Sequence, residues 1–304
     1  MKLAATLIHK SAMPIAIHAV RTFAACYRDS YRLEIHTDGS LDEGDHSTLL
    51  QAAGAMQTVI VTPTDRAPIV TRELAHYPRT AELVARKGYF TKIELAIASA
   101  KPYFYFDSDI VWLRPADDLM PATHANAFST ESWSWYYGVR KTRLWVAEKI
   151  PRRVNSGFYH VGEEFPLQRM ETMLEMGMFD PTIEGNGDQE IMAYLFRDMT
   201  LYHPEDLKRS RVGVEYDLAG CQAVALHFPG RMWIRHMDQI EKYAPSPSSP
   251  RVAMKYCEAK PLSHGEIIRM RLYMMLAEWK IARQPIRIYR DLRRTLAGRK
   301  NKPS

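Results

Sequence analysis

An alternation of apolar segments and helical stretches over the first 61 residues constrains the fold of this chain most strongly. The apolar segments 3–8, 33–36 and 57–61 have the length of strands, and residues 11–27 and 43–53 between them are expected to be helices. Strands that alternate with helices favour parallel pairing through right-handed crossovers. The segment contains no phosphate-binding loop and no G-x-G-x-x-G, which argues against P-loop enzymes and classical dinucleotide binders.

The next apolar run, 103–106, ends in a pair of carboxylates, and a second apolar run, 110–113, follows at once within FYFDSDIVWL at 104–113. Continuous apolar residues of this length predict a strand buried on both faces. Alternate residues of an extended chain share a face, so we expect Asp107 and Asp109 on one side and Ser108 on the other. Two adjacent carboxylates repel each other and need a compensating cation. Oxygen ligands suit Mg²⁺ or Mn²⁺, so the pair predicts a divalent metal site at the end of a strand.

Polar residues at the ends of other expected elements are candidates for the same site. Lys92 lies in the first turn of an expected helix, 91–98, either as a solvated charge or as a ligand-binding group. Asp188, before Gln189, begins a helix that extends to Phe196, where a carboxylate is either an N-cap or an active-site group. Position along the chain does not separate these alternatives.

Two further motifs place small or metal-binding residues on strands. The sequence N-S-G-F at 155–158 lies inside an expected strand, 154–161, and its small middle residues would let a ligand or another backbone approach. His227 closes the apolar segment 223–226 before a glycine turn, either as a metal ligand or as a hydrogen-bonded structural residue.

Charge and composition limit the classes of partner. The chain has 304 residues, and 41 Lys and Arg against 35 Asp and Glu give a net charge of +6. That excess favours phosphate-bearing ligands or an anionic membrane surface. Only the C-terminal tail is strongly basic, which argues against a nucleic-acid partner. No apolar run reaches the roughly 20 residues of a membrane span, and three widely spaced cysteines are expected to be reduced thiols in a cytoplasmic protein.

The proline- and serine-rich stretch APSPSSP divides the chain by composition. We expect a main domain at 1–243, a linker at 244–251 and a basic helical extension at 252–304. Arginines of the expected helix 286–299 would either lie on an anionic membrane, on the inner face of the cell membrane, or form the solvated face of a packed helix.

Taken together and in order, these motifs resemble those of GT-A-type glycosyltransferases, which use a nucleotide-sugar donor. The later motifs are similar to those of the retaining family 8 enzymes, the glycogenin-like and bacterial lipopolysaccharide glucosyl- and galactosyltransferases, and the N-terminal IHTDGSL resembles loosely characterised bacterial glycosyltransferases. The resemblance covers roughly residues 1 to 235. Its stretches are IHTDGSL, the Lys92 helix with FYFDSDIVWLRP, RVNSGFYHV, GDQEIMAYLF and ALHFPG. It implies an α/β fold with a Rossmann-like, mostly parallel sheet flanked by helices.

The resemblance also implies a metal site and a reacting centre. Asp107 and Asp109 match the D-x-D that holds Mn²⁺ or Mg²⁺ and, through it, the donor diphosphate, and His227 matches a third ligand. Asp188 with Gln189 would lie near the reacting anomeric carbon. Family 8 usually has a Lys and a Pro-Trp shortly after the histidine motif. Here RMWIR stands instead, so Arg231 or Arg235 is the expected substitute.

The remaining implied contacts are with the donor. Lys92 and Ser108 would lie near the donor sugar or phosphate, and Asn155 and Gly157 would line the sugar pocket. The end of the first strand, with Leu7, His9 and Lys10, would hold the nucleoside together with Asp38.

These inferences lead to one function and two alternatives. The chain is expected to move a hexose from a nucleotide sugar, with a UDP-sugar favoured, to a saccharide or lipid-linked acceptor. A sugar-nucleotide nucleotidyltransferase would need a glycine-rich N-terminal signature, which is absent. A non-catalytic carbohydrate- or membrane-associated protein would keep a degenerate transferase fold. The motifs favour retention of configuration, whereas Asp188 or Glu190 acting as a base would give inversion.

Overall fold

The computed structural model contains one large sheet and one small sheet. It describes residues 1–120, 125–130, 154–179, 187–196, 198–209, 217–230, 232–245 and 249–260, and the single residues 263, 265 and 268. The large sheet has eight strands in the order β3-β2-β1-β4-β7-β6-β8-β11. Its strands are β1 (Lys2–Ile8), β2 (Tyr31–Thr37), β3 (Thr58–Val61), β4 (Tyr103–Phe106), β6 (Asn126–Thr130), β7 (Val154–Val161), β8 (Thr200–Tyr202) and β11 (Tyr256–Glu258).

The large sheet is mostly parallel, which confirms the expected α/β class. Strands β1 to β4 all run in one direction, and β7 and β11 are antiparallel to their neighbours. Cα pairing joins Ile8 to Thr37 across β1 and β2, and Ala5 to Tyr105 across β1 and β4. The carboxyl ends of these three strands therefore meet at one edge of the sheet, where open α/β sheets bind their ligands.

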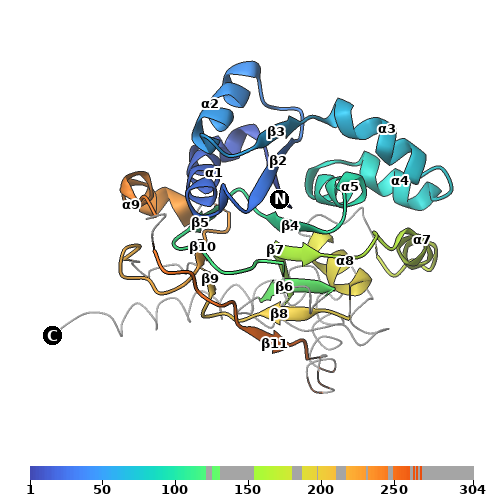
Figure 1. Cartoon of the computed structure of the whole chain (residues 1–304). Helices are drawn as coiled ribbons and strands as arrows, with labels where there is room; N and C mark the ends of the chain where they lie inside the picture. Colours follow the sequence, from blue (N-terminus) through green and yellow to red (C-terminus); the bar gives the residue numbers. More distant parts are fainter. Residues whose placement is uncertain are drawn as a thin grey trace, which may run out of the picture.

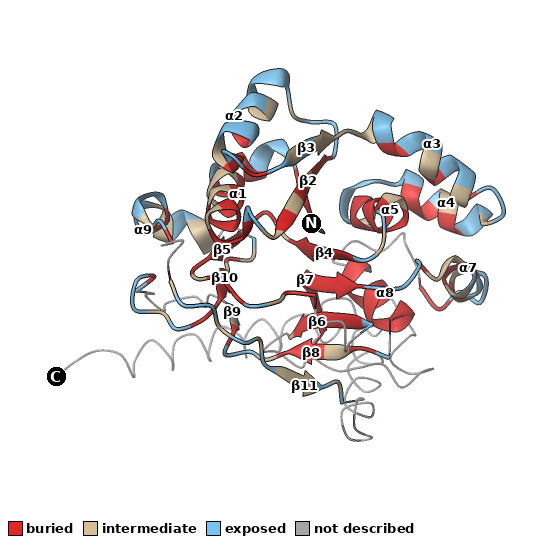
Figure 2. Cartoon of the chain, in the orientation of Figure 1, coloured by how far each residue is buried: buried red, intermediate tan, exposed pale blue. Residues whose placement is uncertain are grey.

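Helices cover both faces of this sheet (Figure 1). The helices on one face are α1 (Met13–Tyr27) and α2 (Glu43–Ala53), and those on the other are α3 (Pro63–Glu73), α4 (Pro78–Ala85), α5 (Thr91–Ala98), α7 (Leu167–Glu175) and α8 (Gly187–Leu195). Their sheet-facing residues are buried; α1, α2, α3, α4 and α7 also have exposed residues on their outer faces, whereas α5 and α8 are buried almost throughout (Figure 2). Helices α2 and α3 both begin with a capping box, Asp42 with Asp45 and Thr62 with Asp65, which satisfies the first N–H groups of each helix.

The apolar runs 103–106 and 110–113 form two strands that belong to different sheets. Strand β4 ends at Phe106, and β5 (Ile110–Trp112) pairs in the small sheet with β10 (Ala225–His227), which pairs in turn with β9 (Leu207–Arg209). The N–H of Ile110 donates to the carbonyl of Asp107 at 3.2 Å, closing a turn between the two strands. The expectation of an extended carboxylate pair is therefore wrong, and both aspartates lie in a turn that joins the two sheets.

The described residues after the expected linker rejoin the large sheet. Val252 bridges to Ala116, and β11 pairs antiparallel with β8 as an edge strand. The first part of the expected extension therefore packs on the main domain, because its strand completes the hydrogen bonding of β8. The proposed domain limits remain predictions, since the helix expected at 286–299 falls outside the described residues. Among the helices described, none has the length and apolar character needed to cross a membrane.

Glu171 supplies the missing cap of α4 from a neighbouring helix, and this generates a test of the fold. No side chain of the N-cap residue bonds to α4, but the buried carboxylate of Glu171 accepts hydrogen bonds from Arg79 N, Thr80 N and Thr80 Oγ1, each at 2.8 Å. Because a charged acceptor satisfies these donors, we expect Glu171→Ala to lower the free energy of unfolding by about 2 kcal/mol in urea titration. Glu175→Ala, an exposed change on the same helix, is the control and should have little effect. Equal stabilities for the two variants would contradict the capping role.

Candidate metal and donor site

Two aspartates in the turn between β4 and β5 and one histidine on β10 form a candidate metal site. Asp107, Asp109 and His227 each offer a ligand atom, and these atoms all lie within 4.8 Å of one another. The antiparallel pairing of β10 with β5 sets His227 opposite Ile110, next to the turn. The N–H of Phe228 donates to the carbonyl of Asp109 at 2.9 Å, which fixes the backbone of the two segments to each other.

The contacts of Asp109 fit a bound divalent cation. Its Oδ1 is buried and accepts no hydrogen bond, although His227 Nε2 lies only 3.2 Å away. A buried carboxylate oxygen without a donor is costly, and a cation shared with the imidazole would satisfy both groups. Two carboxylates with one imidazole suit Mn²⁺ among the hard and borderline divalent ions. The three side chains thus have the chemistry and the spacing that a metal requires.

Lys92 is a buried cation between two carboxylates, not a solvated helix charge. Its Nζ lies 2.9 Å from Asp107 Oδ1 and 3.1 Å from Asp188 Oδ2, and its side chain is 10% exposed. Burial alone would lower the pKa of Lys92, but the charges of Asp107 and Asp188 outweigh burial and raise it. Burial would raise the pKa of Asp107, and Lys92 with His227 lowers it below its usual value. Lys92 and Asp107 are therefore both held in their charged forms.

Tyr105 and Ser156 complete this network, and neither was among the residues expected from the sequence. The Tyr105 hydroxyl donates to Asp107 Oδ1 at 2.7 Å, and the Ser156 hydroxyl donates to Asp188 Oδ2 at 2.8 Å. Tyr105 lies two residues before Asp107, and alternation along β4 could have suggested their common side. Ser156 carries no comparable signal, since its partner Asp188 lies 32 residues away along the chain.

Gly157 allows the side chains of Asp107, Asn155 and His227 to approach one another. A Cβ at this position would lie 2.7 Å from Asp107 Oδ2, 2.8 Å from Asn155 Oδ1 and 2.9 Å from His227 Cε1. A side chain at this position would have to displace the side chains of Asp107, Asn155 or His227, which glycine leaves in place. Asp107 Oδ2 therefore lies on the side of His227, while Oδ1 is bound by Tyr105 and Lys92. The approach of a ligand or another backbone, expected at this strand, remains a prediction, because the close neighbours of Gly157 are side chains.

Asn155 links this strand to the start of α8. Its Oδ1 accepts from Gly157 N at 2.8 Å, and its Nδ2 donates to Gln189 Oε1 at 3.3 Å. Asp188 and Gln189 lie in the first turn of α8, where the helix dipole favours a carboxylate. Arg169 anchors the other end of α8 by donating to the carbonyl of Leu195 at 2.7 Å.

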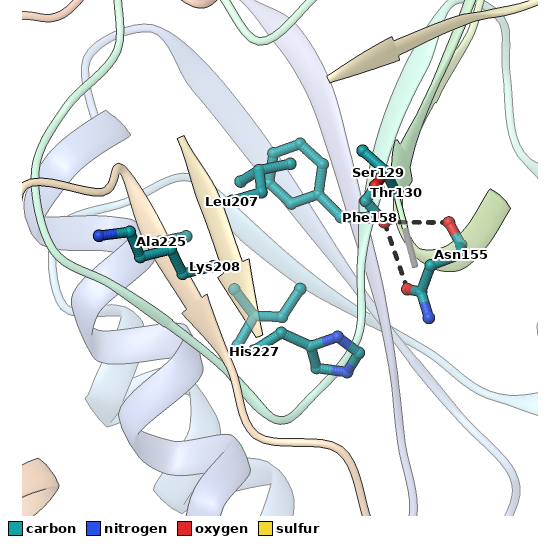
Figure 3. A pocket seen from close by; sticks show the side chains of 9 residues that line it. Ser129, Thr130, Asn155, Phe158, Leu207, Lys208, Ala225 and His227 are labelled. Carbon is teal, nitrogen blue, oxygen red and sulfur yellow. Dashed lines mark hydrogen bonds between the residues drawn. The ribbon is translucent and has the colours of Figure 1, made fainter. Parts of the chain in front are cut away.

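A small cavity lies where the two sheets meet (Figure 3). Ser129, Thr130 and Asn155 line it from the large sheet, and His227 with its neighbours on β9 and β10 lines it from the small one. Ser129 Oγ donates to the carbonyl of Asn155 at 2.9 Å, which fixes the backbone that carries the Asn155 amide. The cavity measures about 20 Å³, which is room for a water molecule rather than a sugar.

The other residues expected to bind the donor lie at the carboxyl ends of β1 and β2 or in the turn. His9, Lys10 and Asp38 are exposed, Leu7 is half-buried and Ser108 is buried. Their roles remain predictions. Lys10 forms ion pairs with Asp42 and Asp45 at the start of α2. Of the two expected substitutes for the family 8 lysine, Arg235 is exposed and Arg231 lies outside the described residues.

Comparisons with known proteins give likenesses at the level of structure. No family model and no curated protein sequence matches the chain. The galactosyltransferase LgtC, solved with donor and acceptor sugar analogues, is 13% identical at a TM-score of 0.49, over 80% of this chain and 97% of that one. Mouse xyloside xylosyltransferase 1 is 12% identical at 0.46, over 74% and 96%. The bifunctional glycosyltransferase WbbM is 10% identical at 0.48, over 80% and 50%. Likenesses this weak do not decide a function, which must follow from the site itself.

Gly157→Ala tests whether the close approach at this residue holds the site together. The added methyl group would collide with Asp107, Asn155 and His227, so we expect Mn²⁺ binding to weaken at least about tenfold in calorimetry, with some loss of stability. Gly44→Ala adds the same methyl group in α2, and this control should bind Mn²⁺ as the wild-type protein does. Unchanged Mn²⁺ affinity in Gly157→Ala would contradict the geometry described.

Proposed function

We propose that the chain is a metal-dependent glycosyltransferase that moves a hexose from a nucleotide sugar to a saccharide or lipid-linked acceptor. One observation carries the proposal. A metal-type cluster, Asp107, Asp109 and His227, adjoins a buried lysine–carboxylate network at the carboxyl edge of parallel strands. This edge is where α/β sheets bind ligands, and the network adds polar groups suited to a sugar.

The leaving group explains why such a site needs a cation. When the glycosidic bond of a nucleotide sugar breaks, the nucleoside diphosphate gains negative charge. Asp107, Asp109 and His227 would hold a divalent ion, Mn²⁺ or Mg²⁺, that acts as a Lewis acid toward the diphosphate oxygens. UDP-sugars are the donors that we propose.

The chain's own residues would prepare the sugar side of the reaction. Lys92 and Ser156 hold the Asp188 carboxylate in one orientation, and Asn155 holds the Gln189 amide. We assign both side chains to the neighbourhood of the anomeric carbon. Positive charge develops there in the transition state, and the fixed carboxylate of Asp188 would stabilise it without reorganisation.

The buried charges also favour an enzyme over a degenerate binding protein. Desolvating Lys92 and its two carboxylates costs free energy that hydrophobic side chains of similar volume would not. A fold without a reaction to perform has no evident reason to keep three charges in this arrangement. Peripheral membrane contact through the basic residues of 252–304 is part of the proposal and would place a lipid-linked acceptor within reach.

Asp109→Asn tests the proposed function directly. The amide has nearly the same size as the carboxylate but no charge, so we expect the fold to persist and Mn²⁺-dependent transfer or hydrolysis of a UDP-sugar to fall by about 100-fold or more. Asp238→Asn, an exposed change on α9 (Met237–Lys242), is the control and should keep full activity. Turnover of Asp109→Asn at the wild-type rate would refute the assignment. Pyrophosphate release from a nucleoside triphosphate and a sugar phosphate would instead indicate nucleotidyl transfer.

A further inference from the structure

A buried arginine outside the candidate site connects three elements that border it. The side chain of Arg66, on α3, is 1% exposed. Its Nε donates to Glu94 Oε1 at 3.2 Å, its Nη1 donates to the carbonyl of Val61 at 3.1 Å, and its Nη2 donates to the carbonyl of Thr37 at 2.9 Å. One rigid guanidinium thus fixes a carboxylate and two backbone carbonyls relative to one another.

The partners of Arg66 belong to the ligand-binding edge of the sheet. Thr37 and Val61 are the last residues of β2 and β3, and Glu94 lies on α5, two residues after Lys92. Asp38 follows Thr37 directly. Arg66 therefore joins the backbone at the ends of two strands to the helix that carries the buried cation of the candidate site.

The charges around Glu94 indicate that its position is closely determined. The Glu94 side chain is 3% exposed, and Lys87 approaches its second oxygen, Oε2, at 2.8 Å. Lys87 reaches it from a left-handed backbone conformation, with a φ of 58°, which lysine adopts only at a cost in free energy. A buried ion pair is a poor source of stability compared with apolar packing. The arrangement instead gives α5 one fixed position relative to the ends of β2 and β3.

That position matters for a ligand that extends across several strands. A diphosphate bound at Asp107 lies beyond β4, and β1 and β2 follow in the sheet at spacings of about 4.8 Å each. The end of β2 is therefore about 10 Å from the end of β4, within the reach of a nucleoside attached to that diphosphate. The pairing of Ile8 with Thr37 makes this backbone part of the same edge.

We propose that Arg66 is a positioning residue for the nucleoside end of the donor. It holds the backbone at Thr37 and Asp38 at a fixed distance from α5, so that nucleoside and diphosphate contacts form together. This role rests on the proposed function, because the ligand concerned is the donor nucleotide. Arg66 itself touches no ligand and acts through Thr37 and Glu94.

The first test is calorimetric binding of UDP in the presence of Mn²⁺. We expect Arg66→Met to raise the dissociation constant about tenfold or more, because the strand ends lose their common anchor. Arg21→Met is the matched control. Arg21 also donates to three carbonyls, those of Ile240, Glu241 and Tyr243, but it does so from α1 on the other face of the sheet. The control should lose stability and bind UDP with wild-type affinity.

A double variant separates positioning from stability. In Arg66→Met with Glu94→Met both members of the buried pair become apolar, so we expect more stability than in Arg66→Met alone. The carbonyls of Thr37 and Val61 remain without their donor, so UDP affinity should stay weakened about tenfold. If Arg66→Met does not fold, the double variant still tests the positioning role of Arg66.

The outcomes distinguish this inference from the proposed function. Wild-type affinity for UDP in a folded Arg66→Met or in the double variant overturns the positioning role alone. An equal loss of UDP affinity in Arg21→Met also overturns the positioning role, because the loss in Arg66→Met would then follow from lower stability alone. Failure of the wild-type protein to bind UDP with Mn²⁺ overturns the proposed function, and the positioning role fails with it.

Discussion

The candidate site depends on the ion contacts of Lys92. Three aspartates lie close together at one edge of the sheet, and like charges at such distances cannot all remain ionised without a cation. Lys92 neutralises Asp107 and Asp188 from the core side. Asp109 has no lysine or arginine partner among the described residues, and its buried Oδ1, 3.2 Å from His227 Nε2, accepts no hydrogen bond. The divalent ion that we propose would supply a second cation on the outer side, where His227 would share it. Lys92 and the proposed metal ion would together neutralise the three carboxylates of the site.

The meeting of the two sheets brings these charges together. If β4 and β5 were one strand, His227 could not reach the aspartates through β10, because β10 pairs only with β5 and β9 among the described strands. The turn at residues 107–109 lets the chain leave the large sheet and enter the small one. Because Gly157 has no side chain, Asp107 and His227 can both lie close to it. The turn and the absence of a side chain at Gly157 therefore allow Asp107, Asp109 and His227 to lie close together.

Much of the fold follows from local patterns, whereas the site depends on contacts that the sequence does not encode locally. Helices 43–53 and 91–98 and strand 154–161 agree with their expected limits, because caps, apolar spacing and turn residues are local signals. The turn at 107–109 was not expected, because an extended chain would also place Asp107 and Asp109 on one side. The alternatives for Lys92 stayed open because its partners are 15 and 96 residues away. No sequence pattern marks Arg66, since only the folded chain places Thr37 and Glu94 beside it. The roles of the donor-binding residues remain predictions.

The central claim is that a divalent cation bound by Asp107, Asp109 and His227 anchors a donor diphosphate. Anomalous diffraction from crystals grown with Mn²⁺ and UDP, with data collected on both sides of the manganese absorption edge, tests it most directly. We predict one strong manganese peak between these three side chains, with the UDP diphosphate bound to it. Density for UDP without manganese at this position, or manganese bound only elsewhere, would contradict the account.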